Sequence, residues 1–218
     1  MVSTQNASLF SSGSLLILFF QIFLLALTKG FLDTTFPGMH TAQLLYFPIL
    51  IGLIGMAYAA KQFGQDEIYP WHYSNQIFLL ILGGSVAIAL GQVLFITETN
   101  NPNLGVHTSG IVCLILGHIL LAIGFYYLVR KELYNLYLND RILKEPKAEL
   151  PIAYVGLTIS YVFFLISSLL TDAALIDIFN LVGIGVAIIF SIVSVIGYLR
   201  LNILFKAYPL IFQSDEDF

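Results

Sequence analysis

Charged side chains are scarce in this sequence, which has only 9 Lys and Arg and 13 Asp and Glu among 218 residues. About a quarter of the residues in a soluble globular domain are charged, and disordered chains have few apolar residues. Here 58% of the residues are hydrophobic, so the composition excludes both classes. Cysteine is nearly absent as well, and the single Cys113 excludes an internal disulfide and a cysteine-based metal site.

Six runs contain no charged residue and are long enough to cross a bilayer, which takes roughly 20 helical residues. These runs are 9–28, 41–60, 74–97, 108–129, 151–170 and 178–199. The sequence therefore predicts an all-α integral membrane protein, with residues 1–218 forming a single six-helix transmembrane domain. Membrane lipid is the expected partner, and no nucleic acid is expected.

Basic residues are concentrated between the fourth and fifth runs. Residues 130–150 hold five of the nine, namely Arg130, Lys131, Arg141, Lys144 and Lys147. Because Lys and Arg are enriched in cytoplasmic loops, this connection is predicted to face the cytoplasm. Six spans then place both termini in the cytoplasm, and Lys29 is the one basic residue expected on the outer side.

Small residues recur in the third and fourth runs. They are Gly83, Gly84, Ala87 and Gly91 in the third run, and Gly110, Gly117 and Gly124 in the fourth. Such a stripe lets two helix backbones approach closely, or leaves room for a flat cofactor between them. Helix packing is the more common use of this pattern.

The six runs contain no Asp, Glu, Lys or Arg, so buried proton relays, voltage sensors and Ser-His-Asp catalysis lack their usual residues. Histidine remains. His40 and His107 open the second and fourth runs from the outer side, and His72 opens the third from the inner side. Imidazole is a common axial ligand of haem iron, so His40 and His107 are candidates for one bis-histidine site. The alternative is that both are interfacial side chains bound to water or lipid headgroups.

His118 lies further along the fourth run, 11 residues beyond His107. That spacing places it about 16 Å deeper on nearly the same helical face. Two imidazoles on one face could serve two stacked haems. A hydrogen-bonded core residue is the favoured interpretation, because buried polar side chains normally find partners.

Sequences around these histidines resemble the cytochrome b561 family, including its membrane domains attached to DOMON modules. Residues 36–40 (FPGMH) with Pro48 resemble the family's second helix, and residues 71–73 (WHY) with Gln76 resemble the start of its third. Residues 103–110 (NLGVHTSG) are similar to the Asn-x-x-x-His-Ser-x-Gly opening of its fourth. The resemblance implies a four-helix core of spans 2–5 with two flanking helices. It also implies two haems b that carry electrons across the membrane, often from ascorbate to a ferric or radical acceptor.

Carried over by this resemblance, His40 and His107 would hold the outer haem iron, and His72 would be one ligand of the inner haem. The family's second inner ligand opens helix five, where this chain has no histidine. Tyr154 is a residue of that region which could bind iron. The implied function is thus a haem b electron-transfer protein, acting as a transmembrane oxidoreductase, with the outer site the more complete. Lys61, Arg141 and Lys144 could attract a small anionic reductant to the cytoplasmic face. The more common role of basic residues in such loops is to set the orientation of the protein in the membrane.

Two other functions fit the sequence. The missing histidine, short loops and uncharged spans are also typical of a haem-free structural or assembly subunit, bound to other membrane subunits or to a second copy. A small-molecule channel or transporter is less favoured. Pro48 is the only proline in the middle of a run, and the two halves show no clear repeat.

Overall fold

The computed structural model describes residues 6–17, 19, 46–65, 70–100, 104–139, 142 and 145–213. Within these ranges the chain is helical and contains no strand. Lipid offers no hydrogen-bond partner to backbone N–H and C=O groups, so long apolar segments satisfy them within helices. The predicted all-α class is confirmed for the described part of the chain.

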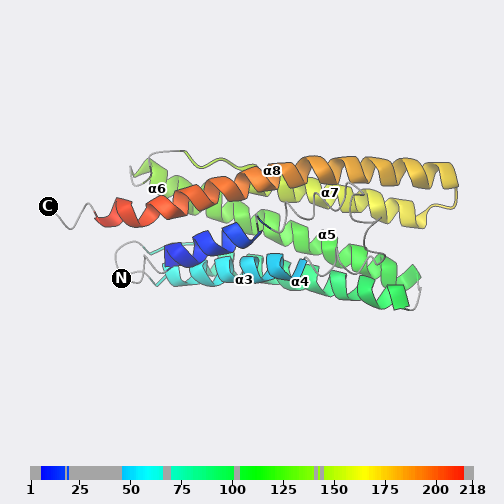
Figure 1. The fold of residues 1–218 in the computed structure, drawn as a ribbon, viewed down its shortest axis with the longest axis horizontal. Coiled ribbons are helices and arrows are strands. Elements are labelled where there is room, and N and C mark those ends of the chain that lie inside the picture. The colour runs from blue at the N-terminus through cyan, green and yellow to red at the C-terminus, as the bar shows by residue number, and fades with distance from the viewer. Residues whose placement is uncertain are drawn as a thin grey trace.

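The helices lie side by side along one axis (Figure 1). A helical segment at 6–17, called here the N-terminal segment, comes first. It is followed by α3 (Tyr46–Phe63), α4 (Ser74–Asn100), α5 (Leu104–Tyr126), the π-helix η1 (Tyr127–Leu133), α6 (Tyr134–Leu138), α7 (Glu149–Leu169) and α8 (Ala173–Gln213). In Figure 1, α7 and α8 form one side of the bundle, α3 and α4 the other, and α5 lies between them.

Four of these helices are long and apolar enough to cross a membrane. They cover Ser74–Leu94, Gly105–Leu138, Glu149–Leu169 and Ala173–Lys206, and Phe47–Phe63 is a shorter apolar helix. Their outward faces carry large apolar side chains such as Leu79, Val155 and Leu181, which fits contact with lipid. These observations are consistent with the predicted multi-pass membrane protein. The predicted spans 9–28 and 41–60 lie partly outside the described residues.

Two helical paths are longer than a bilayer requires. The 41 residues of α8 extend about 60 Å, twice the roughly 30 Å of a hydrocarbon core. The path of α5 continues through η1 and α6 to Leu138, past the predicted end of the span at Val129. It does so because Leu133 and Leu136 stay buried, while Arg130 and Lys131 are exposed to solvent. The first part of the predicted loop 130–150 is therefore helical.

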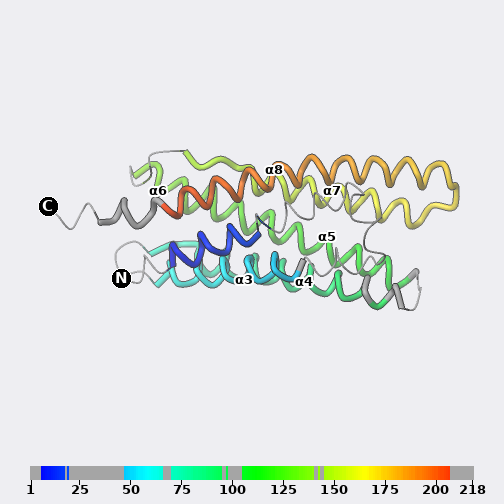
Figure 2. The backbone as a smooth tube through the Cα atoms, in the orientation of Figure 1, coloured from blue at the N-terminus to red at the C-terminus, as the bar shows by residue number. Residues whose placement is uncertain are grey.

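The two ends of the bundle can be told apart in Figure 2. We call the inner end the one where α3 ends, α4 begins and α6 lies, and the outer end the one where α7 ends and α8 begins. The names inner and outer follow the predicted orientation, in which the inner end faces the cytoplasm.

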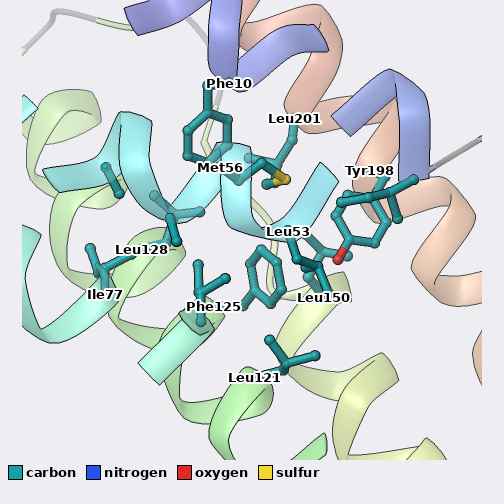
Figure 3. Packing of buried hydrophobic residues seen from close by; sticks show 14 of the residues in the cluster. Phe10, Leu53, Met56, Ile77, Leu121, Phe125, Leu128, Leu150, Tyr198 and Leu201 are labelled. Atoms are coloured by element: carbon teal, nitrogen blue, oxygen red, sulfur yellow. The ribbon is translucent and has the colours of Figure 1, made fainter. Parts of the chain in front are cut away.

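Neighbouring helices in the chain pack against one another, in the order α3, α4, α5, α7 and α8. The N-terminal segment joins α3 to α8 at the inner end. A Cβ on Gly13 would lie 2.8 Å from the carbonyl oxygen of Gly52, and the ring of Phe10 stacks on Phe205 with centroids 4.1 Å apart. Figure 3 shows Phe10 and Tyr198 in one core with residues of α3, α5 and α7. The first and last helices, predicted to flank the core, thus contribute to it directly.

Glycines set the distance between α4 and α5. A Cβ on Gly117 would lie 2.6 Å from Cγ1 of Ile88 and 2.9 Å from the carbonyl oxygen of Gly84. A Cβ on Gly91 would likewise lie 2.9 Å from Cγ of Leu114. The small-residue stripe is therefore used for close helix packing, and side chains occupy the space that a flat cofactor would need on this face.

Candidate functional site

The predicted histidines lie at different depths of the bundle. His107 is in the first turn of α5 at the outer end and is partly exposed, whereas His72 precedes α4 at the inner end and is exposed. The 27 residues of α4 separate these two ends by about 40 Å. His40 lies outside the described residues.

His118 is deep in α5, and its side chain is buried. Its Nδ1 lies 2.6 Å from the carbonyl oxygen of Leu114, so Nδ1 carries the hydrogen and donates it. The ring centroid lies 5.0 Å from that of Tyr161 and 5.8 Å from that of Tyr154. His118 is therefore a hydrogen-bonded residue at the contact between α5 and α7.

Tyr154, which the sequence suggested as a residue that could bind iron, is hydrogen-bonded to another tyrosine. Its hydroxyl oxygen lies 2.5 Å from that of Tyr198 on α8, and both side chains are buried. The ring of Phe125 stacks on that of Tyr154 with centroids 5.3 Å apart, and it makes a T-shaped contact with the ring of Tyr198 with centroids 5.7 Å apart. We call His118, Phe125, Tyr154, Tyr161 and Tyr198 the aromatic centre.

The aromatic centre joins two residues, His118 and Tyr154, that the sequence suggested separately. Tyr161 and Tyr198 were missed by sequence reasoning, because nothing in an apolar run marks which tyrosine faces another helix. The spacing of seven between Tyr154 and Tyr161 was the available signal, since residues seven apart share a helical face.

A second polar group was also missed. Glu132, on η1, is only 4% exposed, and its Oε1 accepts a hydrogen bond from the backbone N–H of Tyr73. The backbone N–H and the imidazole of His72 also lie close to this carboxylate. Glu132 lies four residues from both Leu128 and Leu136, and this spacing was the available signal that it shares a buried helical face. It was missed because a charged residue in this region was expected to lie in a solvated loop.

The inner haem implied by the resemblance does not fit these residues. His72 is exposed beside Glu132, while the hydroxyl of Tyr154 is bonded to Tyr198. Apolar side chains of α4, α5, η1 and α7 fill the interior at this level (Figure 3); they include Ile77, Phe125, Leu128 and Leu150. Among the described residues, His72 and Tyr154 therefore do not form a pair of axial ligands that face each other across an open space.

Metal-ligating side chains are dispersed elsewhere too. Among the residues that the structure describes, no group of three or more His, Cys, Asp or Glu could hold a metal ion. Comparison with family models, curated proteins and solved structures gave no match for this chain. The resemblance to the cytochrome b561 family consequently rests on the sequence motifs alone and stays a prediction.

Proposed function

We propose that this chain is a haem-free structural or assembly subunit of a larger membrane complex. The observation that carries the proposal is the filled inner half of the bundle. Tyr154 and Tyr198 satisfy each other's hydroxyl groups, and large apolar side chains occupy the space around them. A filled inner half together with broad apolar outer faces favours binding to lipid and to partner helices over chemistry in this part of the bundle.

A second candidate is an electron carrier with one haem b, held at the outer end by His40 and His107. The position of His107 favours it, because this partly buried imidazole lies in the first turn of α5, at the depth where the resemblance places an outer ligand. Haem iron would supply one-electron chemistry by cycling between its ferrous and ferric states.

We also propose that both termini face the cytoplasm. The charge distribution supports this orientation. Every described Lys and Arg lies toward the inner end: Lys61, Arg130, Lys131, Lys147, Arg200 and Lys206. Asp172 and Asp177 lie at the outer end. An excess of basic residues on one side is typical of the cytoplasmic face.

Haem content of the purified protein tests both functions. A structural subunit gives no b-type band in the reduced-minus-oxidised spectrum. The single-haem carrier gives one haem per chain, lost in His107→Ala and in His40→Ala but retained in the matched variant His72→Ala. Two haems per chain would contradict both functions, because the inner half would then have to open.

The structural function also predicts a stable association with other membrane proteins, which haem content does not test. In mild detergent extracts of its own membrane, the chain should migrate within a complex much heavier than itself. Removing the chain should lower the amount of the other members of that complex. Migration as a free single chain would contradict the assembly role.

A further inference from the structure

Glu132 is the one Asp or Glu whose side chain is buried in the part of the chain that the structure describes. Burying a carboxylate is strongly unfavourable unless hydrogen bonds replace its water. Here the replacement comes from the start of α4, where the backbone N–H of Tyr73 donates to Oε1 and the N–H of His72 lies nearby. Its partners thus belong to the α3–α4 turn, 59 residues earlier in the chain.

The start of α4 needs such a partner. The residue before its first turn is Tyr73, whose phenol cannot fold back on the adjacent N–H groups as a Ser, Thr, Asp or Asn side chain would. A helix N-terminus carries partial positive charge and favours an anion. Glu132 therefore caps α4 from another helix.

The segment that carries Glu132 is also unusual. η1 is a π-helix of seven residues, and π geometry is rare, mostly limited to single turns and frequent at functional sites. Its buried side chains form two adjacent pairs, Leu128–Val129 and Glu132–Leu133, and the second pair follows the first by four residues. Arg130 and Lys131, between the two pairs, are exposed. Contacts to the rest of the bundle must compensate for this less favourable helix, and the bond from Tyr73 to Glu132 is its polar contact with α4.

We propose that Glu132 is a latch that holds η1 in its π-helical form against the start of α4. When the carboxylate leaves the N-terminus of α4, η1 relaxes toward an ordinary α-helix. Because the two helix types turn by different angles per residue, α6 then rotates about its axis relative to α5. The latch therefore couples the α3–α4 turn to the orientation of α6 at the inner surface.

The α3–α4 turn is well suited to transmit this change. The backbone N–H of Trp71 donates to the carbonyl oxygen of Phe63 at 3.0 Å, and the two rings stack with centroids 4.4 Å apart. The same turn also contacts η1 directly, because the ring of Tyr73 packs on that of Tyr127, the first residue of η1, with centroids 5.3 Å apart. Release of Glu132 thus removes the hydrogen bond between the α3–α4 turn and η1, while the contact between the rings of Tyr73 and Tyr127 remains.

Two variants and one matched control test the latch in detergent micelles. Glu132→Ala removes the acceptor, and Glu132→Gln keeps the volume and one acceptor oxygen, so that a folded protein remains available. Asp177→Asn is the control, because Asp177 is an exposed carboxylate of α8 at the outer end of the bundle, far from η1. Spin labels at Leu79→Cys on α4 and Leu138→Cys on α6, both exposed positions, report the orientation of α6 in a Cys113→Ala background.

With Glu132 present, we expect one narrow distance between the labels. Glu132→Ala should add a second distance, and amide hydrogen exchange should rise about five- to tenfold in both 70–76 and 127–138, the factor that loss of a helix cap implies. Glu132→Gln should show a smaller change of the same kind, and Asp177→Asn should show none. Unchanged distances in both Glu132 variants would overturn the proposal. So would faster exchange confined to 70–76, because Glu132 would then cap α4 without controlling η1.

Discussion

The phenolic oxygens of Tyr154 on α7 and Tyr198 on α8 lie 2.5 Å apart in the interior of the bundle. One hydroxyl donates and the other accepts, so each removes the cost of burying the other. Phe125 on α5 contacts both rings, and the three side chains therefore connect three helices at one level. Tyr154 thus links α7 to α8 through its hydroxyl group and to α5 through its ring.

Removing either hydroxyl of this pair should destabilise the protein. Tyr154→Phe or Tyr198→Phe leaves the other hydroxyl buried without its partner, at a cost of about 1–2 kcal/mol. The double variant buries no unpaired hydroxyl, so its loss should be clearly smaller than the sum of the single losses. Unfolding in mixed micelles measures these differences, with Tyr126→Phe at an exposed position as the control. Strictly additive losses would show that the two hydroxyls do not depend on each other.

Close packing of α4 on α5 should make Gly117 sensitive to substitution. In Gly117→Ala the added methyl group would meet Ile88 and the carbonyl oxygen of Gly84, and overpacking of this kind costs about 1–3 kcal/mol. Gly185 on α8 is the matched control, because no atom lies within 4 Å of a Cβ placed there. Gly185→Ala should leave thermal stability unchanged or slightly higher. Equal losses at both positions would contradict the packing observed at Gly117.

The helical architecture was accessible from the sequence because its cause is local. A run such as 151–170 must be helical in lipid whatever its neighbours are, and it corresponds closely to α7 (Glu149–Leu169). The extension of α5 to Leu138 was not accessible, because Arg130 and Lys131 interrupt the apolar run while Leu133 and Leu136 remain buried. Burial there depends on the helices that pack against them.

The contacts of the candidate site depend on pairs far apart in the chain. Tyr154 and Tyr198 are separated by 44 residues, and Glu132 and Tyr73 by 59. Periodicity places each residue on a face of its own helix, but which face meets which helix is set by packing of the whole bundle. The sequence accordingly suggested His118 and Tyr154 as separate candidates and gave no sign of the capping role of Glu132.

Asn202 should anchor the N-terminal segment to α8. Its buried Nδ2 donates to the carbonyl oxygen of Ser11 at 2.8 Å and also lies within hydrogen-bond distance of the hydroxyls of Ser11 and Ser14. In Asn202→Ala these contacts are lost, and we expect a loss of about 1–2 kcal/mol in stability. Limited proteolysis should then cut the chain faster near its start. Asn135→Ala, at an exposed position, is the control, and an equal cleavage rate in both variants would contradict the anchor.

The orientation of the bundle can be tested with two single cysteines in a Cys113→Ala background. Asn139→Cys lies just after α6 at the inner end, and Thr171→Cys lies between α7 and α8 at the outer end, both at exposed positions. Because basic residues gather at the inner end, we expect a membrane-impermeant maleimide to label Thr171→Cys in intact cells. Asn139→Cys should react only after the membrane is permeabilised. The reverse pattern would invert the proposed orientation, and labelling of both in intact cells would contradict the placement of the two ends on opposite sides of the membrane.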